Sequence, residues 1–163
     1  MPTSFPEQIP LLLQTINRLS PATILDIGCG NGKMGHLVKE YFPDITIDAA
    51  EVFPKYIKNC HRENYGTITI GNALEMDIAQ YDLYLIIDVL EHWEKEPAMV
   101  LLRKLTKMGD VLISTPRSVG EQGAEYGNKW ETHVSQWLEY EFDEFQSEPL
   151  PSDFAFIRIL KKV

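Results

Sequence analysis

The feature that most constrains the fold is a short apolar segment that runs directly into closely spaced glycines. Residues Thr23 to Ile27 are mostly aliphatic or β-branched, and the sequence GCGNG follows at positions 28–32. An unbroken apolar run of this length predicts a strand that is covered on both faces of a sheet. The glycines allow a tight turn and let backbone N–H groups approach a ligand closely. Because helical apolar spacing comes next, the sequence predicts a strand–loop–helix unit with a ligand-binding loop.

The rest of the chain alternates between segments with strand-like and helix-like patterns. This alternation predicts an α/β fold with a doubly wound, mostly parallel sheet, helices on both faces and an antiparallel C-terminal strand. In such folds, ligands bind beyond the carboxyl ends of the strands, where the strand order reverses. The predicted strands cover residues 23–27, 45–50, 67–70, 83–87, 111–114 and 154–160. The predicted helices cover 9–19, 34–41 with a start inside the glycine cluster, 54–62, 73–79, 98–108 and 137–140.

The acidic composition limits the partners of the protein. The 163 residues include 15 Lys or Arg and 24 Asp or Glu, so the net charge is −9 with neutral histidines. Without a basic stripe, a long nucleic acid is not an expected partner. The two cysteines, Cys29 and Cys60, indicate a reducing compartment. No signal peptide and no membrane span are recognisable. We expect a single cytoplasmic domain over residues 1–163, with an N-terminal helix within 1–20; the oligomeric state stays open.

Two ligand classes are compatible with the glycine loop. The set Gly30, Gly32 and Gly35 fits a dinucleotide-binding spacing, which leaves an NAD-dependent oxidoreductase as an alternative. Asp26, however, lies at the end of the strand, with one residue between it and the loop. A pyrophosphate there would meet a like charge, whereas a ligand with ammonium and sulfonium groups would find an acceptor. Asp26 therefore favours a cationic cofactor, and a purely structural role in capping the turn is its alternative.

Residues at the ends of the next two strands extend the predicted site. Glu51 lies 19 positions after Gly32, near the spacing at which an acidic side chain accepts hydrogen bonds from both ribose hydroxyls. Its neighbour Val52 is expected beside the same ligand. Asn72 and Ala73 follow the third strand, where an amide can hydrogen-bond an adenine edge. A role of Asn72 as a turn former is the alternative.

Taken together, these segments resemble the class I S-adenosylmethionine-dependent methyltransferases. The resemblance rests on ILDIGCGNG at 24–32, Glu51, NAL at 72–74 and DVLEH at 88–92, and it extends to Val163. It implies a seven-stranded Rossmann-like sheet, with S-adenosylmethionine as cofactor and S-adenosylhomocysteine as product. Asn72 departs from the aspartate that is more common in the family. The expected cofactor-binding residues are Asp26, Gly28, Cys29, Gly30, Gly32, Glu51, Val52, Asn72, Ala73 and Asp88.

Two histidines are the candidate catalytic residues. A hydroxyl acceptor must lose its proton, and imidazole is the natural base near neutral pH. His92 follows the fourth strand at the ligand-binding edge. His133 follows an irregular segment that can fold back over the site. A surface or helix-end position without function is the alternative for each of them.

The same region leaves a divalent metal site open. Asp88, Glu91 and His92 lie within five residues, His133 follows, and such ligands suit magnesium, manganese or zinc. The pattern is similar to that of the ubiquinone-pathway O-methyltransferases and the small-RNA terminal 2′-O-methyltransferases. In these relatives a Glu-x-x-Glu-His segment and a later histidine hold a metal. Asp88 replaces the first glutamate, so we predict transfer without a metal and keep the metal as an alternative.

The sequence constrains the acceptor only in part. No Asn-Pro-Pro-Tyr type segment follows the fourth strand, which by family analogy disfavours methylation of amide or exocyclic nitrogens. We predict methyl transfer to a small molecule or sugar, at oxygen; a module that binds the cofactor without turnover is a further alternative. Residues 116–135 lack periodicity and are expected to form a substrate lid. Aromatic residues that could line the pocket are Trp93, Tyr126, Trp130 and Trp137, with at least one expected in the core.

Overall fold

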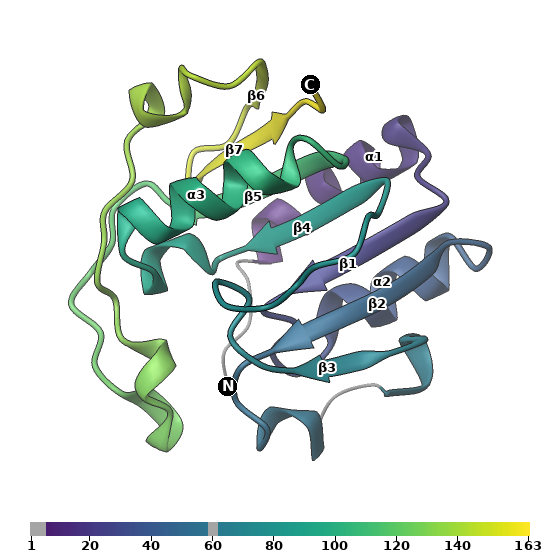
Figure 1. Ribbon diagram of the computed structural model, residues 1–163, viewed down its shortest axis with the longest axis horizontal. Coiled ribbons are helices and arrows are strands. Elements are labelled where there is room, and N and C mark those ends of the chain that lie inside the picture. Colours follow the sequence, from purple (N-terminus) through teal and green to yellow (C-terminus); the bar gives the residue numbers. More distant parts are fainter. Residues whose placement is uncertain (1–5, 59–61) are drawn as a thin grey trace.

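The computed structural model describes residues 6–58 and 62–163, and a seven-stranded sheet forms its centre (Figure 1). The strand order is β3-β2-β1-β4-β5-β7-β6. Neighbouring strands from β3 to β5 are parallel, whereas β7 is antiparallel to both β5 and β6. The predicted doubly wound, mostly parallel sheet is thus confirmed. The strands are β1 (Thr23–Ile27), β2 (Thr46–Glu51), β3 (Ile68–Ile70), β4 (Leu83–Ile87), β5 (Asp110–Pro116), β6 (Ser147–Leu150) and β7 (Ala155–Leu160).

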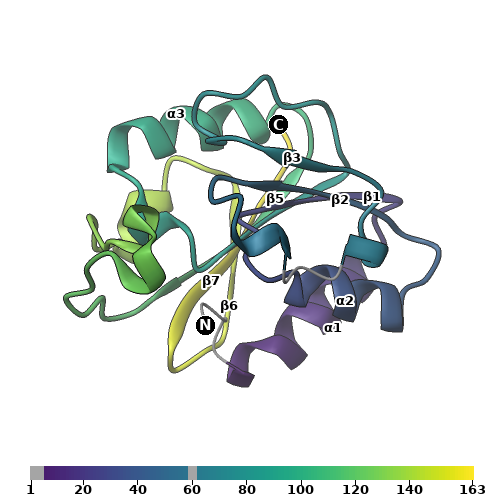
Figure 2. The same cartoon turned by 90° about the horizontal axis from the view of Figure 1, so that it is seen from below.

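Three α-helices cover the two faces of the sheet (Figure 2). Helices α1 (Ile9–Leu19) and α2 (Lys33–Tyr41) lie on one face, and α3 (Lys95–Leu105) lies on the other. Each face has its own hydrophobic cluster, and alternate side chains of β4 enter the two clusters. Every residue of β4 is therefore buried, which explains its unbroken apolar sequence. None of the described helices has the length and apolar character that crossing a bilayer requires.

The strands β1 and β4 lie side by side, and the chain leaves them toward opposite edges of the sheet. From β1 it continues to β2 and β3, and from β4 it continues to β5. The strand order therefore reverses between β1 and β4, and folds of this kind bind ligands beyond the carboxyl ends of the strands at such a point. In Figure 1 the arrowheads of β1 to β4 point to the same edge, so the segments that follow these strands lie near one another.

Two helices predicted between β2 and β4 are not formed as expected. Residues 73–79 are irregular, and the helix predicted there is wrong. Ala73 and Ile78 are buried in the cluster beneath α3, so their apolar spacing reflects burial and not helical geometry. Short 3-10 turns at Tyr56–Lys58 and Arg62–Asn64 take the place of the helix predicted over 54–62. Residues 59–61, which include Cys60, lie outside the described part of the chain.

The C-terminal part differs from the predictions in the extent of its elements. Strand β5 is longer than predicted because β7 pairs with it from Val111 to Pro116 and β4 pairs with Asp110. Strand β6 was not predicted, since it contains Pro149, which is tolerated only because β6 is the edge strand. A 3-10 turn at Glu139–Phe142 replaces the helix predicted over 137–140. Helix α3 already ends at Leu105, ahead of Gly109.

The tight connection between α3 and β5 predicts a strong effect of Gly109→Ala. A Cβ atom at Gly109 would lie 2.2 Å from the carbonyl oxygen of Tyr81 and 2.9 Å from that of Asp82. Since backbone must move, we expect the free energy of unfolding in urea to fall by about 1–3 kcal/mol. Gly120→Ala is the control, because a Cβ atom there would meet no atom within 4 Å. Equal stability of the two variants would contradict this packing.

Candidate functional site

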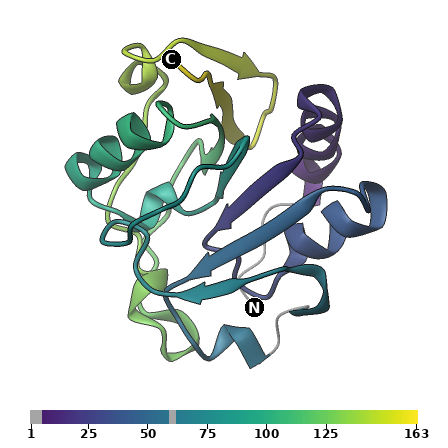
Figure 3. The ribbon, with the colours of Figure 1, turned by 45° about the vertical axis from the view of Figure 1, so that its right-hand side comes forward.

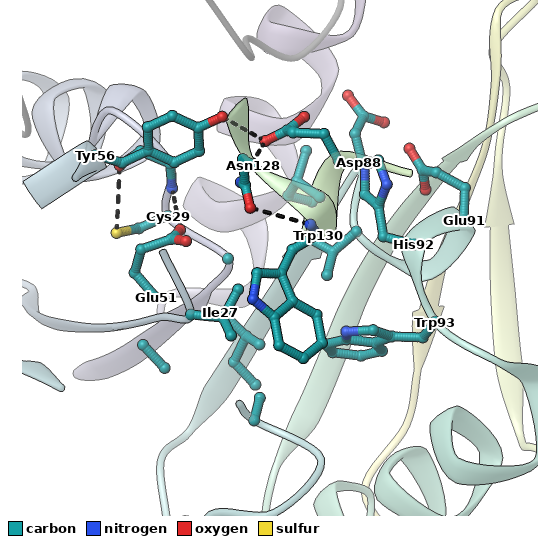
Figure 4. Close-up of a pocket in the computed structure, with 18 of the residues that line it drawn as sticks. Ile27, Cys29, Glu51, Tyr56, Asp88, Glu91, His92, Trp93, Asn128 and Trp130 are labelled. Atoms are coloured by element: carbon teal, nitrogen blue, oxygen red, sulfur yellow. Dashed lines mark hydrogen bonds between the residues drawn. The ribbon is translucent and has the colours of Figure 1, made fainter. Parts of the chain in front are cut away.

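A cavity of about 420 Å³ lies at the carboxyl ends of β1, β2 and β4. Five segments supply most of its lining: the segments after these three strands, the segment after β3 and the 116–135 segment. In Figure 4, Cys29, Glu51 and Tyr56 lie on one side of the pocket, and Asp88, Glu91 and His92 lie on the other. All the predicted cofactor residues except Gly32 line this cavity, and so do both candidate histidines, His92 and His133. The structure thus gathers residues from distant parts of the sequence at one place.

The glycine loop needs its glycines for its backbone conformation and for its closeness to a neighbouring loop. Gly28, Gly30 and Gly32 have φ angles of 77°, 53° and 79°, in a region that side chains with a Cβ rarely adopt. A Cβ atom at Gly28 would lie 2.5 Å from Cγ2 of Val89, which follows β4. The loop after β1 therefore approaches the loop after β4 more closely than any other residue type would allow.

Asp26 lies beneath the glycine loop, where its carboxylate is almost fully buried. It is 3% exposed, and its Oδ2 accepts a hydrogen bond of 2.6 Å from the hydroxyl of Tyr65. Burial raises the pKa of Asp26 to about 7; the hydrogen bond from Tyr65 opposes this shift, and the nearby charge of Glu51 adds to it. Asp26 lines the cavity as predicted, but its direct partner is a tyrosine that the sequence did not reveal.

Glu51 joins the glycine loop to the end of β2. Its Oε2 accepts from the backbone N–H of Gly30 at 2.9 Å, and its Oε1 accepts from that of Phe53 at 2.8 Å. The residue is 5% exposed, and burial raises the pKa of its carboxyl group, while these backbone hydrogen bonds oppose the rise. Since each carboxylate oxygen can accept a second hydrogen bond, Glu51 can still bind a pair of hydroxyl groups.

Asn31, in the same loop, has a buried amide without a protein partner. Neither Nδ2 nor Oδ1 of its side chain is hydrogen-bonded, although both atoms are buried and the residue lines the cavity. A buried polar group without a partner is unfavourable and calls for an explanation such as a bound ligand. The amide offers both donors and an acceptor, so it suits a ligand that carries both ammonium and carboxylate groups.

At the far end of the cavity, the side chain of Asn72 is engaged within its own turn. Its Oδ1 accepts from the backbone N–H of Leu74 at 3.2 Å, and its Nδ2 donates to Oε1 of Glu75 at 3.1 Å. This geometry corresponds to the turn-forming alternative for Asn72. Val52 and Ala73 also line this end, so the predicted adenine side is apolar with a polar edge.

Asp88 is held in a strained conformation by two buried side chains. Its φ angle is 53°, which is uncommon for a residue other than glycine. Nε2 of Gln8 donates to its Oδ2 at 2.7 Å, and Oγ of Ser114 lies 3.0 Å from its Oδ1. The Ser114 hydroxyl is also 2.5 Å from Oε1 of Gln8, which is 2% exposed. The segment before α1 and strand β5 therefore fix the side chain that follows β4.

Both candidate histidines contact a backbone carbonyl through the same ring nitrogen. Nδ1 of His92 lies 3.2 Å from the carbonyl oxygen of Thr132, and Nδ1 of His133 lies 2.7 Å from that of Gly120. Because a carbonyl oxygen only accepts, each Nδ1 carries the hydrogen and each Nε2 keeps a lone pair. Burial lowers the pKa of His92, which favours this neutral form.

Glu91 completes a cluster with these two histidines. One possible ligand atom from each of Glu91, His92 and His133 lies within 4.8 Å of the others. Glu91 is 2% exposed and accepts from Oγ1 of Thr115 at 3.1 Å. Burial, together with the charge of Asp88, raises the pKa of Glu91 to about 8. The cluster has the composition of a divalent metal site, and its histidines have the backbone hydrogen bonds that commonly orient metal ligands.

The 116–135 segment runs from β5 toward the ends of β2 and β3 (Figure 3). Several of its residues line the cavity. It is irregular, with 3-10 turns at Glu125–Gly127 and Lys129–Glu131. The hydroxyl of Tyr56, which follows β2, donates to Oε1 of Glu131 at 2.8 Å. Asn128 is 2% exposed and also donates to this oxygen, at 3.3 Å. The segment is therefore tied to the Glu51 side of the cavity.

Sequence reasoning missed several residues that shape the site, and it was right about the aromatic residues. Trp93, Tyr126 and Trp130 line the cavity, whereas Trp137 is fully buried in the core, as expected for at least one of them. Asn31 stood in the quoted motif without a role. The other missed residues are Gln8, Tyr56, Tyr65 and Ser114, and their partners are distant in sequence, so no local pattern could have revealed them.

Comparison with known proteins identifies the kind of domain that carries this site. Residues 25–109 match the family described as methyltransferase domain. This region contains the glycine loop, Glu51, Asn72 and the segment after β4. Among curated proteins, none matches the sequence.

Solved structures with the same fold include several methyltransferases. The methyltransferase domain of bacterial CtHen1 is 16% identical, with a TM-score of 0.70, over 95% of this chain and 97% of that one. A proposed O-methyltransferase from Nostoc punctiforme is 20% identical, with a TM-score of 0.68, over 94% of this chain and 55% of that one. Human N-acetylserotonin methyltransferase, solved with S-adenosylmethionine, is 15% identical, with a TM-score of 0.69, over 96% and 52%. The chain thus spans about half the length of the last two proteins, and these likenesses show the fold.

The buried contacts of Asp88 predict that Gln8→Ala destabilises the protein. The change removes the donor to a buried carboxylate and the acceptor for Ser114, so we expect a loss of about 1–3 kcal/mol in the free energy of unfolding, measured in urea. Gln14→Ala, at an exposed position on α1, is the matched control and should change stability by no more than about 0.5 kcal/mol. If both variants behaved alike, the proposed support of Asp88 by Gln8 would be wrong.

Proposed function

The chain belongs to the methyltransferase domain family, and we propose that this S-adenosylmethionine-dependent methyltransferase acts on an oxygen atom of a small, uncharged acceptor. The observation that carries the proposal is that the two sides of one cavity are lined by different kinds of residue. One side has the glycine loop and Glu51, and the other has Glu91, His92 and His133. A cofactor and an acceptor can therefore meet at the end of β4.

The residues on the first side fit the cofactor. The unpartnered amide of Asn31 suits the amino-acid part, Glu51 can accept from both ribose hydroxyls, and the Val52 and Ala73 surface suits the adenine ring. Bound there, the cofactor supplies a methyl group on a sulfonium, which needs an aligned acceptor more than it needs covalent help. Asp88, held by Gln8 and Ser114, would border the methyl-donating end.

We expect Glu51→Ala to weaken binding of S-adenosylhomocysteine at least tenfold, about 1.4 kcal/mol, because two charge-assisted hydrogen bonds are lost. Calorimetric titration of the purified protein measures the affinity. Glu40→Ala, at an exposed position on α2, is the control. A thermal shift with NAD and none with S-adenosylhomocysteine would instead support the dinucleotide alternative with the Gly30, Gly32 and Gly35 spacing.

His92 is the base that this geometry favours. Its Nδ1–H is fixed by the carbonyl of Thr132, its Nε2 keeps a lone pair, and its lowered pKa keeps the ring neutral at neutral pH. Such a base can take the proton of an acceptor hydroxyl while the oxygen attacks the methyl group. His133, with its ring centroid 5.0 Å from that of His92, would orient the acceptor beside it.

The Glu91, His92 and His133 cluster supports a second way to activate the same hydroxyl. A divalent cation held by these three residues would lower the pKa of a bound hydroxyl and fix its position. The backbone hydrogen bonds of both histidines are consistent with this role. Asp88 is engaged by Gln8 and Ser114, so it is not counted among the ligands.

The charges around the cavity favour a neutral acceptor. The lining residues contain six carboxylates and, as basic side chains apart from the histidines, only Lys33. A phosphate or carboxylate on the acceptor would meet more like charges than opposite ones among these lining residues. The rings of Trp93 and Trp130 suit a sugar or an aromatic ring, and a lid formed by the 116–135 segment would exclude water from the transfer.

Methyl transfer to a panel of neutral sugars and phenols, each paired with its phosphorylated or carboxylated counterpart, tests the acceptor and the base. We expect activity with neutral acceptors, at least tenfold less with the charged counterparts, and a loss of about 10²–10⁴-fold in His92→Asn. His36→Asn, on the exposed side of α2, is the control.

The same assay in metal-free buffer separates the two ways of activation. Full activity after treatment with a chelator supports His92 as the base without a metal. Loss of activity that Mn²⁺ or Mg²⁺ restores in the normal protein but not in His133→Ala supports the metal site. Activity only with charged acceptors, or an unaffected His92→Asn variant, would contradict the proposed function.

A further inference from the structure

The hydroxyl of Tyr65 connects the two ends of the glycine loop. It donates to Oδ2 of Asp26 at 2.6 Å, and it accepts from the backbone N–H of Gly35 at 3.0 Å. Asp26 lies in β1, immediately before the loop, and Gly35 lies in the first turn of α2, immediately after it. The hydroxyl of Tyr65 therefore links the strand before the glycine loop to the helix after it. The loop between them lines the proposed cofactor side of the cavity.

We propose that Tyr65 is a positioning residue that holds the glycine loop in its cofactor-binding shape and keeps the carboxylate of Asp26 ready to receive the ammonium group of the cofactor. The proposal rests on the proposed function, because it concerns the same cofactor. Tyr65 itself does not line the cavity, so its effect on binding must pass through Asp26 and the loop.

The glycine at position 35 is part of this arrangement. A Cβ atom there would lie 2.2 Å from Cζ and 2.6 Å from the hydroxyl oxygen of Tyr65. Only glycine lets the tyrosine ring lie against α2 with its hydroxyl between strand and helix. Gly35 fits a dinucleotide spacing in the sequence, but in the structure its missing side chain makes room for Tyr65.

The groups around Asp26 and Tyr65 shift the pKa values of both side chains. Burial raises the pKa of Asp26 to about 7, the charge of Glu51 at the end of β2 adds to this, and the hydrogen bond from Tyr65 opposes it. On the other side, the phenol of Tyr65 faces Asp26 and the thiol of Cys29, and burial raises its own pKa, so it remains a neutral donor. Loss of the Tyr65 hydroxyl would therefore raise the pKa of Asp26 further.

The ionisation of Asp26 should make cofactor binding depend on pH. The ammonium group gains most from the ionised carboxylate, whose fraction rises as the pH passes through the pKa of Asp26. If only the ionised form binds well, affinity increases up to about tenfold between one pH unit below and one above this pKa. Without the hydroxyl, the same increase would occur at higher pH.

The experiment is calorimetric titration of S-adenosylhomocysteine between pH 6 and pH 9 with the normal protein, Tyr65→Phe, Asp26→Asn and Tyr81→Phe. We expect affinity to rise with pH in the normal protein, the rise to move to higher pH in Tyr65→Phe, and the profile to be flat near pH 7 in Asp26→Asn. Tyr81→Phe is the matched control, because the Tyr81 hydroxyl donates to Asp48 at 2.8 Å, away from the cavity, and its profile should be unchanged.

Amide hydrogen exchange in the cofactor-free protein gives a second measurement. Tyr65→Phe should accelerate exchange at Gly35 and across residues 28–32, whereas Tyr81→Phe should not. If Tyr65→Phe does not fold, the Asp26→Asn profile still decides whether the carboxylate carries the pH dependence.

The outcomes separate this proposal from the function on which it rests. Absence of S-adenosylhomocysteine binding in the normal protein would overturn the proposed function itself. Binding that weakens equally at every pH in Tyr65→Phe, or that keeps its pH dependence in Asp26→Asn, would overturn the role of Tyr65 while the proposed function stands.

Discussion

The close approach of the loop after β1 to the loop after β4 is the constraint on which the site depends. Gly28 packs against Val89 at a distance that excludes a Cβ atom. This contact brings the glycine loop close to residues 88–92, and residues of both segments line the same cavity. The neighbouring Asp88 takes up a left-handed backbone conformation, and its side chain is held by Gln8 and Ser114. The strain at Asp88 is thus supported from two other elements of the fold.

The parts of the structure that could be predicted from the sequence are those that depend on neighbouring residues. The strand before the glycines, the helix over 9–19 and the place of Glu51 at the end of β2 follow from local apolar spacing and from the parallel order of the strands. The helix predicted over 73–79 was wrong because burial can produce apolar spacing without helical geometry. Tyr65 and Gln8 meet their partners 39 and 80 positions away, so only the tertiary structure reveals them.

Buried carboxyl groups make the electrostatics of the site dependent on what it binds. The pKa of Asp26 is raised to about 7 and that of Glu91 to about 8, in both cases mainly by burial. Each group has a second carboxylate nearby, Glu51 in the first case and Asp88 in the second, which opposes its ionisation further. A ligand cation beside either group would favour the ionised form, and by linkage the ionised form would favour the cation. The sequence shows that these carboxyl groups are present. Only their burial in the fold shows that their ionisation depends on the pH and on a cation bound nearby.

The 116–135 segment joins the two sides of the cavity into one unit. Glu131 accepts a hydrogen bond from Tyr56 on the cofactor side, and the carbonyl of the next residue, Thr132, accepts from the ring of His92 on the other side. Because these two acceptors are adjacent in the chain, a displacement that releases Tyr56 would also release the ring of His92 and leave its tautomer undefined. The position of Tyr56 and the orientation of the His92 ring, which is the proposed base, are therefore both linked to the same short stretch of backbone. Under the proposed function, the cofactor-binding and acceptor-binding sides would form together, and this would keep water away from the point where they meet.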